Sequence, residues 1–332
     1  MIHMTPYEYT KKLLANRKPS MRWNGIVPIL EWQSLARDKL SELLGLDYMI
    51  AAERDVVIEY DREEPEFREI RFSFQSEPGY YVPCHLLVPK NAAKPLPAVI
   101  ALQGHSKGMH ISLGRTKYPD ETIDGDRDFC VRAVKEGFAA IALEQRDFGE
   151  CGGDENGPRC YEHAMADLLI GRTVVGERVW DVMRCVDTLI SDFQDIVDKR
   201  SIYVMGNSGG GTTSVYAAAL EKRLAGAVPS CAVSTFAGSI GAMRHCACNY
   251  VPGILRYFDM GELLALAAPK KLVVVSGALD PIFPLDGAEK MVADAKRVYD
   301  AIGKPDSIAH VVGPEGHRFY ADIAWDALKK ML

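Results

Sequence analysis

The spacing of hydrophobic residues divides the chain into two parts. In the first part, apolar residues recur three or four positions apart between Trp32 and Leu44, and Gly45 follows, where it can end a helix. After this part, residues 70–74 and 80–88 alternate between apolar and polar side chains, which is typical of strands with one buried face. The pattern predicts a helical N-terminal extension over residues 1–54, followed by an antiparallel edge of a sheet.

In the rest of the chain, short apolar runs alternate with segments of helical spacing. Helical spacing is clearest over residues 179–193 and 288–302. Strands that are apolar throughout and separated by helices indicate a parallel sheet covered on both faces. We therefore predict an α/β fold with a mostly parallel central sheet over residues 55–332. The predicted strands are Ala98–Leu102, Phe138–Leu143, Ile202–Met205, Leu272–Val275 and Ile308–Val312.

Composition and charge exclude several classes of protein. The 332 residues are 48% hydrophobic and 25% charged, which is typical of a globular chain. The net charge of −6 and the mixing of both signs disfavour a nucleic-acid partner. Because we find neither an apolar leader nor a run of about 20 apolar residues, we predict neither export nor a membrane partner. The eight scattered cysteines are then expected to be free thiols in a cytoplasmic protein.

The strongest candidate chemistry follows the predicted strand Ile202–Met205. Residues 206–211 read Gly-Asn-Ser-Gly-Gly-Gly, a G-x-S-x-G motif between a strand and a helix. Such a turn strains the backbone of the serine and lifts its hydroxyl above the sheet. Gly206 and Gly210 are expected where strand and helix pass too close for a Cβ. Since the residues fit neither a phosphate loop nor a dinucleotide fingerprint, we predict that Ser208 is a nucleophile.

A serine nucleophile needs a general base, and the base needs an orienting acid. In this architecture the chain order is serine, acid, histidine. Asp280 lies in a turn directly after the strand 272–275, and His317 directly follows the strand 308–312. Asp286 is a rival acid that lies further from its strand. The spacing predicts Ser208, Asp280 and His317 as a catalytic triad.

Acyl transfer also needs two donors for the oxygen that becomes negative. The backbone N–H of Gly209, directly after the nucleophile, is one candidate. The loop after strand 98–102 supplies the other, because Gly104 lets its backbone approach closely. We take the His105 amide as this donor, with the Ser106 amide as the alternative.

Signals for a metal site are weak. Cys246-x-Cys248 lacks a second pair of cysteines. Residues 124–128 carry aspartates at the spacing of a calcium loop, but phenylalanine and lysine occupy the positions of its glycine and glutamate. We therefore expect no metal. The segment 234–257 is expected to form part of a substrate wall.

Two further residues receive structural interpretations. Arg146, in the loop after the strand 138–143, is expected to brace that loop rather than to act in catalysis. His85 lies on a predicted strand whose alternate residues are apolar, so its side chain is expected to face solvent.

Together these features resemble the α/β-hydrolase superfamily over residues 55–332. More narrowly, the chain is similar to the acetyl-xylan-esterase and dienelactone-hydrolase-like branch. Gln103 departs from the pattern, because many relatives carry histidine there, and this leaves the second oxyanion donor open. The likeness rests on Glu31-Trp32-Gln33 with Leu43-Leu44-Gly45, on Gly104-His105, and on residues 276–284, Ser-Gly-Ala-Leu-Asp-Pro-Ile-Phe-Pro.

The resemblance implies a serine esterase that needs no cofactor and often removes acetyl groups from sugars. The expected partner is therefore a small-molecule ester, hydrolysed through an acyl-enzyme. A serine peptidase of the prolyl-oligopeptidase type is one alternative, although no propeller-sized segment precedes the hydrolase part. A non-catalytic ligand-binding protein of the same fold is another. The acyl chain, the alcohol part and the presence of a homo-oligomer stay open.

Overall fold

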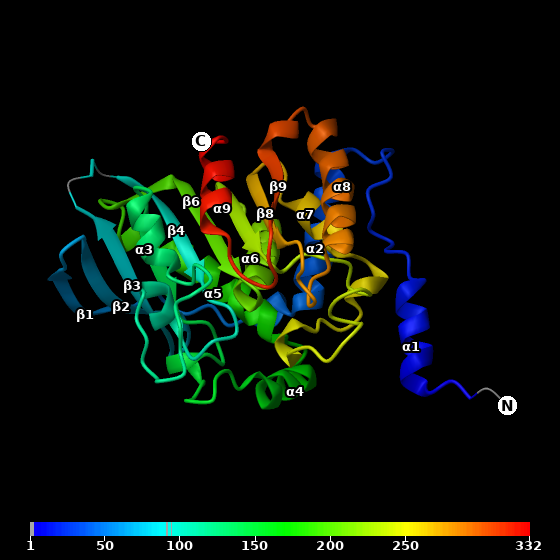
Figure 1. The fold of residues 1–332 in the computed structure, drawn as a ribbon, viewed down its shortest axis with the longest axis horizontal. Coiled ribbons are helices and arrows are strands. Elements are labelled where there is room, and N and C mark those ends of the chain that lie inside the picture. The colour runs from blue at the N-terminus through cyan, green and yellow to red at the C-terminus, as the bar shows by residue number, and fades with distance from the viewer. Residues whose placement is uncertain (1–2, 91, 94) are drawn as a thin grey trace.

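A single twisted sheet runs through the molecule. The computed structural model describes residues 3–90, 92–93 and 95–332, and within them nine strands form the order β1-β2-β3-β5-β4-β6-β7-β8-β9 (Figure 1). The antiparallel edge consists of β1 (Val56–Glu63), β2 (Phe67–Glu77) and β3 (Tyr80–Pro89). The parallel part consists of β5 (Ala139–Leu143), β4 (Leu96–Leu102), β6 (Val197–Asn207), β7 (Gly226–Ser230), β8 (Lys271–Gly277) and β9 (Ile308–Gly313). The predicted α/β fold is therefore confirmed.

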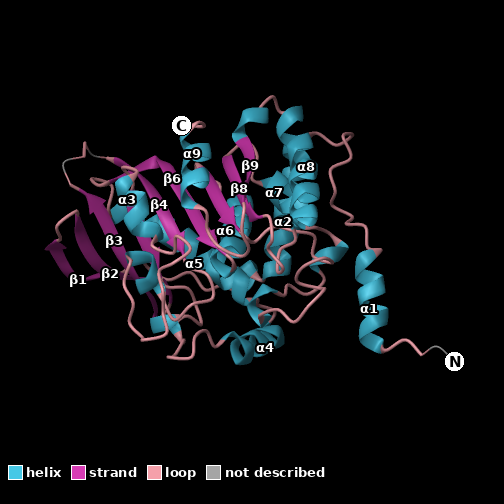
Figure 2. Cartoon of the chain, viewed as in Figure 1, coloured by secondary structure: helices cyan, strands magenta, loops and turns pink. Residues whose placement is uncertain are grey.

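Helices cover both faces of this sheet (Figure 2). Neighbouring residues of a strand point to opposite faces, and on β4 Ile100 belongs to one hydrophobic cluster and Val99 to the other. The cluster of Val99 contains α3 (Phe129–Lys135) and α9 (Ala321–Lys329). The larger cluster, that of Ile100, contains α2 (Ile29–Leu44), α5 (Val174–Asp192), α6 (Gly209–Leu220), α7 (Met260–Leu266) and α8 (Leu285–Ala301).

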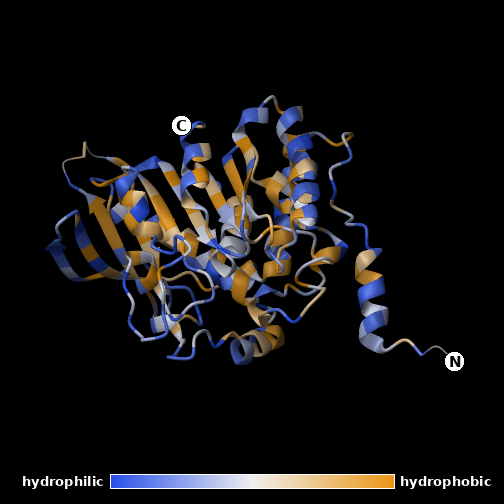
Figure 3. Ribbon diagram, in the orientation of Figure 1, coloured by the Kyte–Doolittle hydropathy of each residue, from blue (hydrophilic) through white to orange (hydrophobic). Residues whose placement is uncertain are grey.

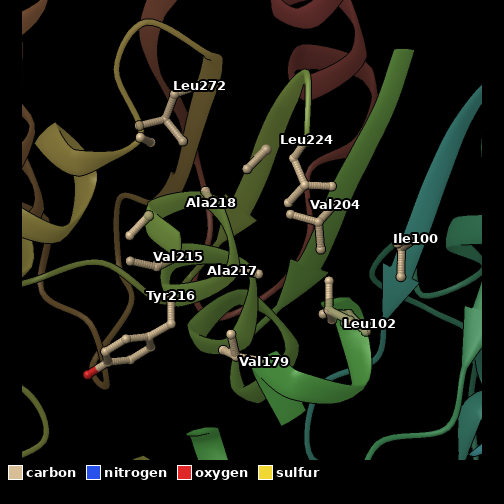
Figure 4. Packing of buried hydrophobic residues seen from close by; sticks show 14 of the residues in the cluster. Ile100, Leu102, Val179, Val204, Val215, Tyr216, Ala217, Ala218, Leu224 and Leu272 are labelled. Carbon is tan, nitrogen blue, oxygen red and sulfur yellow. The ribbon is translucent and has the colours of Figure 1, made fainter. Parts of the chain in front are cut away.

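The helix α6 lies at the centre of the larger cluster. Its Val215 and Ala217 belong to the same buried cluster as Val204 of β6, Leu102 of β4 and Val179 of α5 (Figure 4). Three consecutive alanines, residues 217–219, let this helix approach the sheet closely. The strands around it are apolar along most of their length (Figure 3). Burying each valine or leucine side chain here contributes about 1.5–3 kcal/mol, so α6 and the loop before it are held rigidly.

The N-terminal helices differ in their packing. Trp32, Leu40 and Leu44 of α2 are buried in the larger cluster. As predicted, Gly45 ends this helix, and its backbone has the left-handed conformation. In contrast, α1 (Pro6–Ala15) has no buried residue and lies at the side of the molecule (Figure 1). We propose residues 1–54 as an N-terminal extension of the chain, although α2 packs into the same core as the sheet. Among the described helices, none combines the length and the apolar character needed to cross a membrane.

Two features of the structure, the strand β7 and the position of His85, differ from what the sequence predicts. The strand β7 was not predicted, because Gly-Ala-Val-Pro-Ser has few β-branched residues; its pairing with β6 and β8 holds it in the sheet. The expectation that His85 faces solvent is wrong. Its ring is buried and its Nδ1 lies 2.6 Å from Glu69, whose carboxylate also accepts hydrogen bonds from Arg115. Because Arg115 comes from a distant loop that covers this strand, the alternation within β3 could not reveal the burial.

Candidate active site

The turn between β6 and α6 places Ser208 at its tip. Its backbone has φ 55° and ψ −119°, an unfavourable conformation for a residue with a Cβ. A Cβ on Gly206 would lie 2.5 Å from the backbone of Gly210, and one on Gly210 would lie 2.0 Å from the oxygen of Leu102. The predicted strain and the predicted need for both glycines are therefore confirmed.

Hydrogen bonds from two elements hold this turn. The Ser208 amide donates to the oxygen of Ser230, at the end of β7, over 2.9 Å. The Ser208 oxygen accepts from the Thr212 amide within α6 over 2.8 Å. The amide of Gly209, at the first position of this helix, has no acceptor inside the helix. It is therefore free to face a developing negative charge.

The structure brings Asp280 and His317 into contact. The Nδ1 atom of His317 lies 2.8 Å from Asp280 Oδ2, and Asp280 Oδ1 accepts from the amides of Ile282 and Phe283. Burial alone would raise the pKa of Asp280, but the hydrogen bonds to His317 and to these amides outweigh it and lower the pKa below its ordinary value. The rival Asp286 lies in the first turn of α8. The charged form of Asp280 is thus positioned to orient the imidazole.

Ser208 and His317 line one cavity of about 390 Å³. Gly104, His105 and Ser106 line the same cavity. The ring of His105 lies against Gly209, because a Cβ at Gly209 would be 2.7 Å from His105 Cε1. All the predicted site residues therefore gather at the carboxyl end of the parallel strands, where ligands bind in such sheets.

Buried groups hold the loop after β4. The carboxylate of Glu144 accepts from Gln103 Nε2 over 2.6 Å and from the Met109 amide over 3.1 Å. Burial raises the pKa of Glu144 to about 7, against the opposing effect of its backbone partners. Gln145 Nε2 donates to the oxygen of Gln103 over 2.7 Å. Gln103 thus anchors this loop, through its side chain to Glu144 and through its backbone oxygen to Gln145.

As predicted, Arg146 braces the neighbouring loop. It is buried and forms ion pairs with Glu77, Glu177 and Asp181 at 2.9–3.0 Å. These partners come from β2 and α5, so the arginine ties three elements together behind the site.

The segment 234–257 contributes to the cavity wall as expected, through its residues 243–246. The charged residues of the lining are Arg127, Arg244, Arg318 and Asp124. Arg318 forms ion pairs with Asp126 and Glu315, so the lining keeps a small positive excess, from Arg127 and Arg244 over Asp124. An ester with an anionic group would be attracted to it.

Sequence reasoning missed several groups of potential metal ligands. Among the described residues, one such group is Cys231 with Asp280 and His317, and a second is His163 with two carboxylates beside Arg146. Cys231 directly follows the unpredicted strand β7, so nothing in the sequence marked it.

The third group has donors of a different kind. It contains His105, Cys160, Cys246 and Cys248, which we call the thiol cluster, and its donor atoms all lie within 4.8 Å of one another. Burial lowers the pKa of His105, but hydrogen bonds with Cys246 and Cys248 outweigh it and bring the pKa to about 9. Hydrogen bonds with Cys160 and Cys246 hold the pKa of Cys248 well below its ordinary value. The spacing of Cys246 and Cys248 was the one signal for this cluster in the sequence.

Comparison with known proteins supports the fold. The model of the Abhydrolase family matches residues 2–311. The chain is 27% identical to YtaP of Bacillus subtilis (strain 168), a protein provisionally named a hydrolase, over 255 residues that make up 74% of this chain and 81% of the relative.

Solved structures give the same result. A Bacteroides fragilis protein provisionally named an acetyl xylan esterase has a TM-score of 0.81 at 17% identity, over 100% of this chain and 96% of that one. A glucuronoyl esterase from Solibacter usitatus has a TM-score of 0.68 at 16% identity, over 95% of this chain and 98% of its own. At these identities the likeness establishes a common fold.

Proposed function

Because the chain belongs to the Abhydrolase family, we propose that it is a serine carboxylic ester hydrolase that acts through an acyl-enzyme. The observation that carries this proposal is the strained Ser208 in one cavity with His317, whose Nδ1 is bound by Asp280. This is the arrangement that turns a weakly nucleophilic hydroxyl into a reactive one.

The first half of the proposed reaction forms the acyl-enzyme. Asp280 binds Nδ1 of His317, so Nε2 takes the proton of the Ser208 hydroxyl as its Oγ attacks the ester carbon. The carbonyl oxygen becomes negative and accepts from the amides of Gly209 and His105, or of Ser106 in place of His105. His317 then gives the proton to the leaving alcohol.

The second half returns the free enzyme. A water molecule loses a proton to His317 and attacks the acyl carbon, and Ser208 leaves with that proton. The three side chains end in their starting states, so the cycle needs no cofactor.

We further propose that the substrate carries a short acyl group, such as acetyl, on a carbohydrate or a similar small alcohol. Support comes from the structural neighbours named as acetyl xylan and glucuronoyl esterases. We also propose a cytoplasmic location, because all eight cysteines are free.

The test uses chromogenic acetyl esters and a fluorophosphonate probe. We expect hydrolysis of the ester and labelling of Ser208, and we expect the Ser208→Ala variant to lose both, with a drop in turnover on the order of 10⁶-fold. Full turnover by Ser208→Ala would overturn the proposal.

A substrate series separates the alternatives. Faster cleavage of aminoacyl amides than of acetyl esters would favour the peptidase, whereas binding of an ester without turnover or labelling would favour a non-catalytic protein. Esters graded by acyl length, each with a neutral and an anionic alcohol part, then define the substrate.

A further inference from the structure

The thiol cluster joins three segments that are distant in the sequence. His105 belongs to the loop after β4, Cys160 is the first residue of α4 (Cys160–Ile170), and Cys246 and Cys248 flank the start of the short helix η4 (Ala247–Asn249). Figure 1 shows α4 beside the segment that contains η4, and the two elements are in contact. The cluster is therefore a product of tertiary packing.

Two of the distances between the donor atoms are within about 0.5 Å of those between ligands around one ion. His105 Nε2 lies 3.2 Å from Cys248 Sγ, and Cys248 Sγ lies 3.3 Å from Cys246 Sγ. In a tetrahedral zinc site, with Zn–S bonds of about 2.3 Å and Zn–N bonds of about 2.0 Å, the ligand atoms lie roughly 3.5–3.8 Å apart. The sulfur atoms are too far apart for a disulfide, whose S–S bond is about 2.05 Å.

The charges around the cluster also fit an ion. The Nη2 atom of Arg178 lies 3.4 Å from Cys160 Sγ, and this side chain is only 2% exposed. Its guanidinium also donates to the oxygen of Arg146 and lies over the ring of Phe148. One Zn²⁺ with three thiolates and a neutral imidazole carries a net charge of −1. Arg178 lies beside that charge, and its other acidic neighbour, Asp147 Oδ2, is 3.9 Å away. Cys160 and Cys248 are buried, whereas Cys246 is half-buried and His105 is exposed.

Access to the cluster exists from two sides. His105 and Cys246 line the cavity that contains Ser208, and Cys160 and Cys246 line a second cavity of about 710 Å³. An ion therefore reaches the cluster without passing through the hydrophobic core.

We propose that His105, Cys160, Cys246 and Cys248 bind one Zn²⁺ as a four-coordinate site. Four protein ligands close the coordination sphere, so the ion has a structural role. On binding, Zn²⁺ forms three bonds to sulfur and one to Nε2 of His105, and three protons leave to solvent, because the metal-free ligands hold three more protons than the zinc-bound ligands.

The proposed ion would fix the walls of the cavity. It ties the loop that carries His105 to α4 and to the segment 234–257. Since the His105 ring also lies against Gly209, the ion holds one side of the turn that presents Ser208.

The test measures metal directly. The full chain is produced with added zinc, purified without chelators and analysed by elemental mass spectrometry, with the Cys130→Ala variant as a control. Cys130 is a buried cysteine of α3 in the other hydrophobic cluster. We expect about one zinc per chain in the wild type and in Cys130→Ala, and nearly none in Cys160→Ala or Cys248→Ala. Wild-type protein without zinc, or with copper or iron in its place, overturns the proposal.

Two measurements on the wild type alone guard against variants that do not fold. Stripped protein loaded with Co²⁺ should show the sulfur-to-cobalt charge-transfer and tetrahedral ligand-field absorption of thiolate ligation. In the zinc-loaded chain, Cys160, Cys246 and Cys248 should resist alkylation until a chelator is added, while the reactivity of Cys130 stays unchanged. Equal alkylation with and without zinc, or a disulfide among the three, contradicts the site. Since none of these readouts uses ester turnover, the failure of the site and of the proposed function are distinguishable.

Discussion

The active-site residues and the thiol cluster lie side by side, yet they are held in place by different means. Ser208, Asp280 and His317 each follow a strand of the parallel sheet, and the parallel pairing of β6, β7, β8 and β9 brings them to the carboxyl end of the sheet. Of the thiol cluster, His105 also follows a strand, β4, but Cys160 starts α4 and Cys246 and Cys248 lie in the segment 234–257, outside the sheet. The difference teaches that a sheet can preorganise a site by itself, whereas a site built on loops needs a further bond between them.

The comparison is sharpest for the acid of the triad. We expect Asp280→Asn to lower turnover on the order of 10⁴-fold, because the amide neither holds the neutral imidazole in the correct tautomer nor stabilises the imidazolium that forms. Asp286→Asn is the matched control, since Asp286 is the neighbouring carboxylate at the start of α8. Steady-state kinetics on an acetyl ester measure both. Equal losses in the two variants would show that Asp280 has no special role.

Gly209 tests the point where the two sites meet. A Cβ there would lie 2.7 Å from the His105 ring, so Gly209→Ala must displace the ring or the turn. We expect turnover to fall roughly 10²- to 10³-fold, as when an oxyanion donor is misplaced, and zinc affinity to fall as well. Kinetics and a competition assay with a zinc chelator measure the two effects. An unchanged turnover would show that the turn tolerates the methyl group.

Removing the proposed zinc should lower the thermal stability of the chain whether or not the Ser208 hydroxyl is present. We expect a chelator to lower the melting temperature of the wild type by several degrees, because the ion binds the folded chain alone. The same shift is expected in Ser208→Ala, whose sheet and cluster are intact. Differential scanning calorimetry, with zinc added back, measures it. A shift in one protein and not in the other would mean that the two sites are not built independently.

The smallest expected effect concerns the free energy of unfolding at acidic pH. The pKa of Asp280 is lowered in the folded chain, so its charge stabilises the fold at a pH above its unfolded pKa of about 4. This contribution is lost as the pH falls through the lower, folded pKa. We expect Asp280→Asn to lose less unfolding free energy than the wild type over that range. Urea denaturation at a series of pH values measures it, and parallel curves would refute the expectation.

The sequence predicted what local patterns encode. The turn at Ser208 was predictable because its G-x-S-x-G motif lies between a strand and a helix and fits neither a phosphate loop nor a dinucleotide fingerprint. The helix α2 was predictable from its spacing. The burial of His85 and the meeting of Cys160 with Cys246 were not predictable, since each depends on a segment far away in the chain. The strand β7 was not predictable either, because its pairing with β6 and β8, rather than its residues, makes it a strand.

The packing of α2 has a practical consequence for shortened genes. A chain that starts at residue 55 would lose Trp32, Leu40 and Leu44 from the main core, and the bared surface of α5 and α6 would promote aggregation during expression. A chain that starts at Pro19 would lose α1, with the partly buried Leu14 at the margin of the core, and keep the hydrogen bonds of Ser20 and Met21 to residues 256 and 257. The safe place to trim this protein therefore lies well before the point at which its first strand begins.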